Sequence, residues 1–419
     1  MELKKYKIGD LAHVTRGASL GGEFYATQGN YVRLTCGNFD YRNNCFKENQ
    51  SKDNIYYTGG FKEEFLLEKG DIITPLTEQA IGLLGSTARI PESGKYIQSQ
   101  DIAKIDCNES LLDKDFAFYL ISSACVKQQL SAAAQQTKIR HTSPDKIKEC
   151  TVWIPSLNVQ KRIGRILTDI DNKIAINRQI NDNLEAMAKQ LYDYWFVQFD
   201  FPNEEGKPYK SSGGAMVWNE KLKREIPQGW NNGVLSDVAN ITMGQSPDGS
   251  SYNEDGEGII FYQGSTDFGL RFPDIRQYTT LPSRYANKGD ILMSVRAPVG
   301  ALNIANNDCC IGRGLSALSS KIGSMTHLYY LMNDFRLKFE GMNSAGTTFG
   351  SITKDELFSL PVVIPTKSVI SEFEQVCEPI FDKQMIIGEE INALTKLRDE
   401  LLPLLMNGQA TVNYHLSDD

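Results

Sequence analysis

The feature that most limits the fold of this chain is an internal repeat. Residues 8–19 (IGDLAHVTRGAS) match residues 235–246 (LSDVANITMGQS), and residues 69–73 (KGDII) match residues 288–292 (KGDIL). A third match runs without gaps, from Thr137 with Thr347 through Lys173 with Lys383. Because the three matches keep the same order, they indicate that the 419-residue chain contains two copies of one plan.

Each copy begins with a pattern typical of short strands and ends with one typical of a long helix. In residues 1–155 and 230–365, glycine, aromatic and β-branched residues recur at short spacings between turn signals. Apolar residues then recur with a heptad period over residues 156–197 and 366–419. The pattern predicts an α+β, internally duplicated fold in which two globular domains alternate with two long helices.

The heptads also predict that the two helices pair with each other as an antiparallel coiled coil. One stripe, at position a, contains Ile163 on the first helix and Phe373 on the second. The other stripe, at position d, contains Ile166, Ile180, Met187 and Tyr194 on the first helix and Val376, Leu397 and Leu404 on the second. Polar residues on such seams commonly fix register. The predicted coiled-coil and partner positions are Ile163, Ile170, Lys173, Asn177, Leu184, Leu191, Ile380, Lys383, Leu394 and Leu401.

Residues 198–229 read as a connector between the copies, because they are rich in glycine, proline and serine. Aromatic residues flank this segment, with Tyr194-Trp195-Phe196 before it and Trp218 and Trp230 towards its end. We therefore expect the connector to be packed against the protein.

Composition excludes several classes of protein. The apolar runs fall far short of the ~18 residues that a membrane span needs, and no secretory leader follows Met1, so we expect a cytoplasmic protein. The eight cysteines form no C-x-x-C pair and there are four histidines, which argues against a zinc site and for reduced thiols. Lys69-Gly70-Asp71 and Lys288-Gly289-Asp290 are interpreted as turns that lead into core strands.

Motifs for catalysis are missing from the sequence. It has no G-x-x-x-x-G-K-[ST] phosphate loop, no Asn/Asp-Pro-Pro-Tyr segment and no G-x-G-x-x-G dinucleotide fingerprint. Glu205-Gly206-Lys207 resembles a nuclease E-x-K only superficially, since it lies in the connector without a rigid strand to hold a metal. These observations favour a non-catalytic binding protein with no cofactor of its own.

Net charge bears on the choice of binding partner. The total is −8, and residues 366–419 alone hold four basic and ten acidic residues. Nucleic-acid binding usually leaves a basic footprint, so the acidic total argues against a tight DNA binder that acts alone.

The plan as a whole resembles the specificity subunit of type I restriction-modification systems. Residues 226–230 (IPQGW) are similar to the segment that leads into a target-recognition domain of that family, and residues 288–292 and 312–318 (GRGLSAL) to its internal signatures. Residues 191–196 (LYDYWF), with the connector up to Trp218, are the most family-specific stretch. The resemblance covers essentially the whole chain.

The resemblance implies two target-recognition domains, at residues 1–155 and 230–365, that each read one half of a two-part double-stranded DNA target. The conserved helices at 156–197 and 366–419 would set the gap between the half-sites and dock two adenine-N6 DNA methyltransferase subunits, with motor-nuclease subunits as optional further partners. S-adenosylmethionine, ATP and Mg²⁺ would belong to those partner subunits and not to this chain.

Most candidate DNA-contacting residues lie in predicted loops where the two copies share a position but differ in chemistry, and Arg296 and Arg313 of the second copy are further candidates. Arg and Lys can read guanine, Gln can read adenine, and Ser or Thr hydroxyls suit phosphates. For each residue a solvated loop position is the alternative, and an ion pair with Asp290 or Asp308 is a further alternative for the arginines of the second copy. The candidates are Arg16, Ser19, Lys138, Arg140, Gln245, Ser246, Arg296, Arg313, Thr348 and Ser351.

Two rival interpretations remain. One is a degenerate enzyme, such as a methyltransferase fragment fused to a recognition module, although its motif is missing from the sequence, and the other is a coiled-coil scaffold that binds no DNA. The scaffold accounts for the helices and for the acidity, but it leaves the two duplicated globular regions with divergent loops unexplained.

Overall fold

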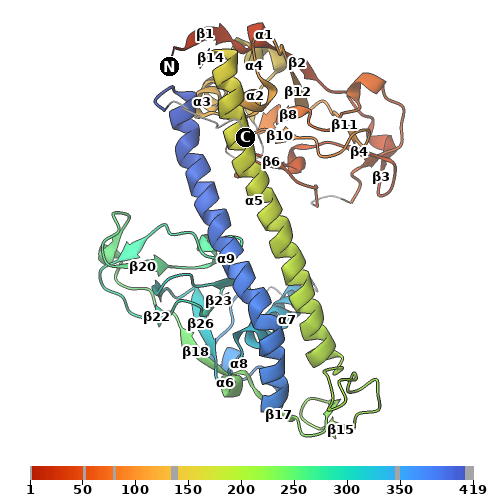
Figure 1. The fold of residues 1–419 in the computed structure, drawn as a ribbon, viewed down its shortest axis with the longest axis vertical. Coiled ribbons are helices and arrows are strands. Elements are labelled where there is room, and N and C mark those ends of the chain that lie inside the picture. Colours follow the sequence, from red (N-terminus) through yellow and green to blue (C-terminus); the bar gives the residue numbers. More distant parts are fainter. Residues whose placement is uncertain (1, 51–52, 79–81, 134–139, 345–349, 411–419) are drawn as a thin grey trace, which may run out of the picture. The chain divides into compact units, whose positions relative to one another are not determined.

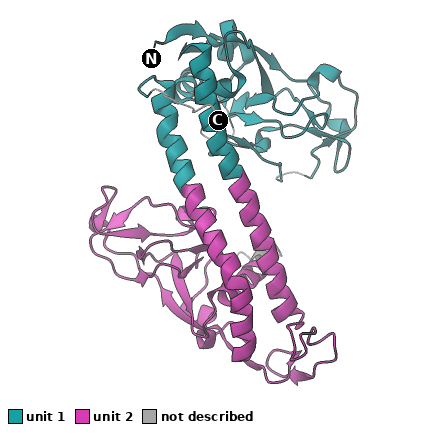
Figure 2. Cartoon of the chain, viewed as in Figure 1, with its two compact units in different colours: residues 1–175, 393–419 teal, residues 176–392 magenta. Residues whose placement is uncertain are grey.

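The computed structural model describes residues 2–50, 53–78, 82–133, 140–344 and 350–410. Within it the chain forms two compact units, one made of residues 1–175 with 393–419 and the other of residues 176–392 (Figure 2). Lys138 and Thr348, two of the predicted DNA-contacting residues, lie outside the described residues. The two units are described in turn.

The first unit contains two four-stranded sheets and four short helices, which pack around two clusters of buried apolar residues (Figure 1). One sheet is antiparallel, with strands in the order β10 (Ala88–Arg89), β8 (Ile72–Pro75), β12 (Ile102–Cys107) and β2 (Ala12–Arg16). The other has the order β11 (Tyr96–Ile97), β4 (Tyr31–Arg33), β7 (Tyr56–Tyr57) and β3 (Tyr25–Ala26). The helices are α1 (Ile8–Leu11), α2 (Lys114–Ile121), α3 (Ala124–Ala133) and α4 (Pro144–Glu149).

Two-stranded pairs complete the first unit. The first residues of the chain pair with the strand that precedes the long helix. This pairing joins the two ends of the globular region into one fold. The pairs are β1 (Lys4–Lys7) with β14 (Thr151–Ile154), β5 (Phe39–Asp40) with β6 (Cys45–Phe46), and β9 (Thr77–Glu78) with β13 (Arg140–His141).

The second unit repeats this plan. Its antiparallel sheet has the order β18 (Ala239–Met243), β26 (Leu315–Ser320), β23 (Ile291–Ser294) and β24 (Leu302–Ile304). A five-stranded sheet has the order β19 (Tyr252–Asn253), β21 (Tyr278–Thr279), β20 (Ile259–Tyr262), β25 (Cys309–Ile311) and β22 (Tyr285–Ala286). The remaining elements are α6 (Leu235–Val238), α7 (Met325–Ser344), α8 (Lys354–Phe358), and β17 (Asn231–Val234) paired with β27 (Pro361–Ile364).

Both Lys-Gly-Asp segments are turns into core strands, as the sequence predicts. Gly70 and Gly289 have φ angles of +84° and +93°, a left-handed conformation that a side chain disfavours. Each turn is followed by a fully buried strand, β8 in the first unit and β23 in the second. The repeated glycine is therefore explained by backbone geometry.

The two predicted long helices are present. The first, α5 (Leu157–Tyr192), has 36 residues and ends in a π-helical turn (Asp193–Val197), and the second, α9 (Lys367–Met406), has 40 residues. In the first unit Ile163 packs in one core with Leu405, and Arg398 bonds Asp171 at 3.1 Å. In the second unit Asn177 bonds Glu390 at 2.9 Å. Since rising numbers on α5 meet falling numbers on α9, the helices form the predicted antiparallel coiled coil.

The predicted position of the second heptad stripe is wrong by one residue. Met187 and Val376 are 54% and 48% exposed, and Lys173 and Lys383 are also exposed. The buried stripe lies one position later and contains Gln160, Leu167, Ile174, Asn181 and Ala188 on α5, and Cys377, Gln384, Ile391, Arg398 and Leu405 on α9. Because several residues of this stripe are polar, the apolar heptad pattern did not indicate it. Two of them bond across the interface, Gln384 with Glu185 at 2.9 Å and Arg398 with Asp171 at 3.1 Å.

The other stripe was placed correctly. Ile163, Asn177, Phe373 and Ile387 are buried, while Ile170, Leu184, Leu191, Ile380, Leu394 and Leu401 are half-buried. Asn177 makes the kind of polar contact within the seam that was expected of it, through its bond to Glu390.

The connector is packed, as predicted, although one of its aromatic residues is not. Trp195, Phe196 and Trp230 are buried in an aromatic cluster with Phe373 of α9, and the ring centroids of Phe201 and Trp230 lie 5.0 Å apart. Trp218, in the hairpin β15 (Met216–Asn219) and β16 (Arg224–Pro227), is 54% exposed. Its indole therefore does not anchor the connector.

None of the helices in the described part of the chain is both long enough and apolar enough to cross a membrane.

Candidate nucleic-acid interface

Four separate segments of the second unit meet along one edge of its antiparallel sheet, and we call them the second rim: residues 244–246, 295–297, 311–314 and 350–352. Backbone hydrogen bonds hold them together. The Gln245 amide donates to the Ile311 carbonyl at 3.0 Å, the Val295 amide to Gly314 at 2.9 Å, and the Ile352 amide to Val295 at 3.0 Å. Segments that span residues 244 to 352 of the sequence are therefore linked in one place.

The second rim carries five of the predicted DNA-contacting residues. Gln245, Arg296, Arg313 and Ser351 are exposed, and Ser246 is half-buried because its hydroxyl accepts a hydrogen bond from the Arg313 amide at 3.3 Å. Arg296 and Ser351 are direct neighbours in an isolated β-bridge. The tertiary structure thus gathers two guanidinium groups, one amide and two hydroxyls on one surface.

The ion-pair alternative for the two arginines is not observed. Asp290 accepts a bond from the Asn287 amide and Asp308 from the Lys288 amide. Within the described ranges, neither the Arg296 nor the Arg313 guanidinium has a carboxylate partner. Both positive charges are therefore available to an anionic ligand such as a phosphate backbone.

The first unit has a rim at the corresponding place, made of residues 16–19, 76–78, 98–101 and 140–142, which we call the first rim. The Ala18 amide donates to Gln98 at 2.9 Å, Leu76 to Asp101 at 2.7 Å, and Thr142 to Leu76 at 2.8 Å. Arg16 and Ser19 are exposed on the first of these segments. The two rims share a backbone design but carry different side chains.

The sequence suggested that Arg140 lies in a loop, but in the structure it does not. It belongs to strand β13, opposite Glu78 of β9, and its Nη1 lies 3.6 Å from Oε2 of that buried carboxylate. Glu78 also accepts a hydrogen bond from the Gly82 amide at 2.9 Å. Since the carboxylate offsets part of its charge, Arg140 is a weaker candidate for a phosphate contact than Arg16.

The sequence comparison missed residues of the first rim that the structure brings to its surface. Thr77 and His141 are paired across β9 and β13, in the places that Arg296 and Ser351 take in the second unit. His141 is exposed. The repeat contained a signal for His141, since it is the counterpart of Ser351 within the third match.

A glycine at the start of each rim allows the close approach of two segments. A Cβ atom on Gly244 would lie 2.1 Å from the Gly312 carbonyl oxygen, and one on Gly17 would lie 2.2 Å from that of Gln98. These distances are far below van der Waals contact, and both obstacles are backbone atoms. The glycine in the first sequence match is therefore a steric requirement of the rim.

Replacing Gly244 by alanine should open the second rim and destabilise the protein by about 1–3 kcal/mol, the usual effect of overpacking. Chemical denaturation followed by circular dichroism measures the change. Gly249→Ala is the matched control, because no atom lies within 4 Å of its added Cβ. Equal stability of the two variants would contradict the steric role of Gly244.

The chain matches the family described as the type I restriction modification DNA specificity domain, over residues 1–186 and 227–396. It belongs to this family. It is 33% identical to the MjaX specificity subunit of Methanocaldococcus jannaschii over 349 residues, which cover 80% of this chain and 77% of that protein. It is 22% identical to the HindI specificity subunit of Haemophilus influenzae over 97% of this chain and 99% of that one.

A solved structure shows the same fold. The S subunit of the type I restriction-modification system from M. genitalium superposes with a TM-score of 0.61 at 16% identity, over 97% of this chain and 96% of that one. The family assignment identifies the two globular regions as DNA specificity domains, and the rims lie within them. It does not favour the scaffold interpretation without DNA binding.

Proposed function

We propose that the chain is the DNA-reading subunit of a type I complex, and that each rim reads one half of a two-part target. The observation that carries this proposal is the meeting of four distant segments at each rim, with Gln245, Arg296 and Arg313 exposed on the second. Base edges are read by such side chains, whereas hydroxyl groups and backbone amides suit phosphates. Different side chains on one backbone design account for two different half-sites.

The helix pair is proposed to hold the two recognition domains at a fixed separation. At 1.5 Å per residue, the 36 residues of α5 extend about 54 Å, which is roughly one and a half turns of B-DNA. A stiff spacer of this kind leaves the bases between the half-sites unread.

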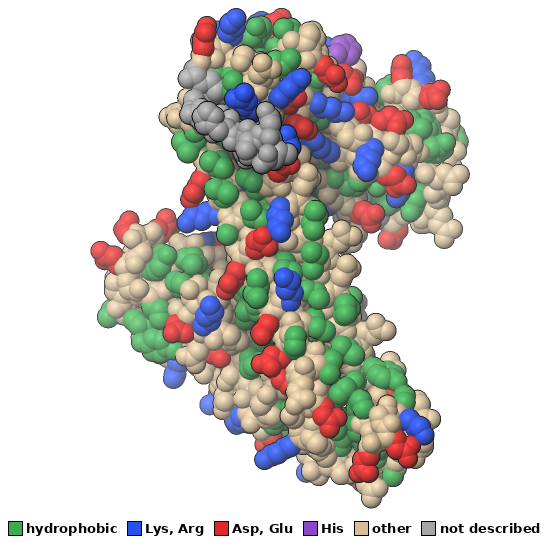
Figure 3. All heavy atoms as spheres, in the orientation of Figure 1, with side chains coloured by type: hydrophobic (Ala, Val, Ile, Leu, Met, Phe, Trp, Pro, Cys, Tyr) green, Lys and Arg blue, Asp and Glu red, His purple; other side chains and the backbone are tan. Residues whose placement is uncertain are grey.

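Methyltransferase subunits are the proposed protein partners, and the helices offer a surface for them. Apolar side chains that do not pack in the seam remain exposed on both helices, among charged ones (Figure 3). Ile180 and Met187 of α5 and Tyr194 of the π-helical turn that follows it recur at seven-residue intervals, a spacing that suits a further packed helix. The matching set on α9 is Val376, Leu397 and Leu404.

The chemistry of the complex is proposed to reside in these partners. S-adenosylmethionine would be held by the methyltransferase subunits, and ATP and Mg²⁺ by motor-nuclease subunits where those are present. The chain itself would contribute recognition and positioning. A shared basic surface with the methyltransferases would offset its own charge of −8.

Exchange of one reader tests the proposal. Replacing residues 1–155 by the matching region of another family member carries both β1 and β14, so the paired strands stay together. We expect the methylated sequence in cells that also express the methyltransferase to change in one half only. Long-read sequencing of modified adenine measures this, and a change in both halves would contradict independent reading.

A further inference from the structure

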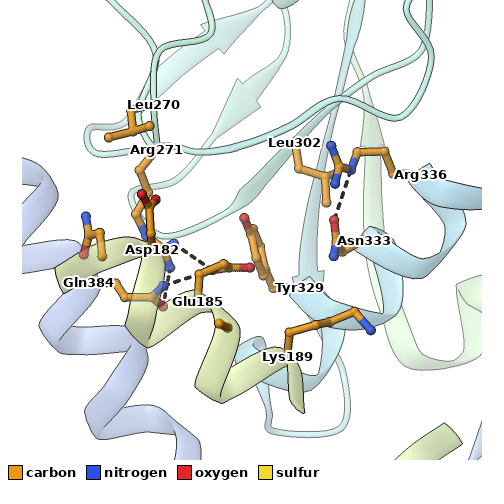
Figure 4. Close-up of a pocket in the computed structure, with 12 residues that line it drawn as sticks. Asp182, Glu185, Lys189, Leu270, Arg271, Leu302, Tyr329, Asn333, Arg336 and Gln384 are labelled. Atoms are coloured by element: carbon orange, nitrogen blue, oxygen red, sulfur yellow. Dashed lines mark hydrogen bonds and ion pairs between the residues drawn. The ribbon is translucent and has the colours of Figure 1, made fainter. Parts of the chain in front are cut away.

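Glu185 of α5 connects three elements of the second unit. Its Oε2 accepts a hydrogen bond from Nε2 of Gln384 on α9 at 2.9 Å and from the hydroxyl of Tyr330 on α7 at 3.2 Å. Nη1 of Arg271, in the loop before β21, lies 3.5 Å from the same oxygen (Figure 4). One carboxylate therefore touches both long helices and two parts of the recognition domain.

Arg271 is held firmly in this arrangement. It is 8% exposed, its Nη2 donates to Oε1 of Gln384 at 3.2 Å, and its guanidinium lies 4.8 Å from the ring centre of Phe381 and 5.5 Å from that of Tyr329. Its carbonyl accepts a bond from the Ile304 amide at 3.0 Å, which ties the loop to β24. A buried arginine so placed resists displacement in several directions.

Close packing alone does not hold the domain at this place. A cavity of about 500 Å³ opens beside Glu185, lined by residues of the helices and of the recognition domain that include Asp182, Lys189, Leu302, Asn333 and Arg336 (Figure 4). On this side of Glu185 the helices and the domain lack direct side-chain contacts. The directional bonds to Glu185 therefore add to the apolar packing of Phe272 and Ile304 against Phe381 of α9 in fixing the orientation.

The first unit has the same kind of connection, built from other residues. Asp171 of α5 accepts a hydrogen bond from the hydroxyl of Tyr119 on α2 at 2.6 Å and one from Nη1 of Arg398 on α9 at 3.1 Å. In both units a carboxylate of α5 thus joins a tyrosine of the recognition domain to a polar residue of α9. The recurrence with different residues argues that the connection serves a purpose in each half.

We propose that Glu185, with Arg271 and Gln384, is a positioning site that fixes the angle at which the second recognition domain meets the helix pair. Because that angle sets where the second rim meets DNA, the site contributes to discrimination between gap lengths. This inference rests on the proposed function, in which the helix pair sets the gap. It assigns the site no contact with DNA.

Arg271→Met tests the proposal by removing the guanidinium while keeping an apolar side chain of similar length against Tyr329 and Phe381. Glu185→Gln, which keeps the shape and removes the charge, is measured in parallel and decides the outcome if Arg271→Met does not fold. The control is Lys288→Met, because Lys288 also pairs with α9, at Glu389, but through an exposed contact of 3.7 Å. All variants are assembled with the methyltransferase subunits.

Binding is measured to duplexes that carry both half-sites of the wild-type methylated sequence, with the native gap and with one base pair more or less. The wild type is expected to prefer the duplex with the native gap. In Arg271→Met and in Glu185→Gln this preference should be about tenfold smaller, the usual effect of losing a hydrogen bond to a charged group. Discrimination against base changes within the half-sites should persist, and Lys288→Met should behave as the wild type.

Three results would overturn the inference. A folded variant that keeps the full gap preference shows that the site does not position the domain. A variant that loses affinity equally for all three gaps, or that loses base discrimination, shows a role other than positioning. A wild-type complex that binds all three gaps equally contradicts the proposed function itself, and the inference falls with it.

Discussion

Removal of residues 174–180 from α5 together with residues 389–395 from α9 is expected to shorten the gap of the methylated sequence by up to about three base pairs. The two segments face each other, since Asn177 bonds Glu390. Seven residues at 1.5 Å each are about 10 Å, and base pairs are spaced ~3.4 Å apart along DNA. Because a whole heptad is removed from each helix, both stripes keep their phase. Glu185, Gln384 and Asp171 remain.

The control for this deletion removes residues 174–180 alone. That change shifts the seam of one helix against the other, so the variant should fail to fold or to methylate. Sequencing of modified adenine in cells gives the gap in each case. A paired deletion that is folded and active but keeps the original gap would show that the methyltransferase subunits or the connector set the spacing, and not the helices.

The double variant Arg296→Ala with Arg313→Ala is expected to abolish recognition of one half-site. Each good contact to a base contributes about 1–3 kcal/mol, so affinity should fall by at least tenfold. If the arginines contact phosphates instead, the plot of log affinity against log salt concentration should become less steep, by about one unit of slope for each arginine removed. Titration of a target duplex at several salt concentrations distinguishes the two cases.

The matched control for the arginines is Lys221→Ala with Lys288→Ala, which removes the same charge from exposed positions outside the rim. A third variant, Arg313→Lys, keeps the charge but loses the planar pair of donors that reads guanine. Its affinity should resemble that of the wild type for a phosphate contact and fall for a base contact. Equal binding by the arginine and lysine double variants would exclude the second rim from DNA recognition.

Parts of the fold were predictable because they depend on local rules. The Lys-Gly-Asp turns require glycine at a left-handed position, and this requirement acts within a few residues. The heptad period of α5 and α9 is likewise local, and it predicted two helices that pair. The position of the second stripe was not predictable, because Gln384 and Arg398 are buried only when the facing helix supplies partners for them.

The candidate DNA-contacting surface shows the same division. Comparison of the copies made Gln245 a candidate, since shared positions with different chemistry are expected where two recognition domains diverge, and Arg296 and Arg313 were further candidates because they are arginines of the second copy. It did not reveal that Arg140 faces Glu78 in a pair of short strands, because that pairing joins segments about sixty residues apart. Thr77 was missed for the same reason, as it becomes part of the first rim only through strand pairing.

The sequence by itself determined the duplication, the order of the domains and the two paired helices, because repeats and periodicity are properties of the chain alone. Only the tertiary structure decided which segments form each rim and which side chains lie in the helix seam. Those outcomes depend on backbone hydrogen bonds and buried polar contacts between distant residues, such as the amide of Gln245 with Ile311 and the carboxylate of Glu185 with Gln384. A polar residue is stable in such a place only when its partner is there, and no single stretch of sequence contains both.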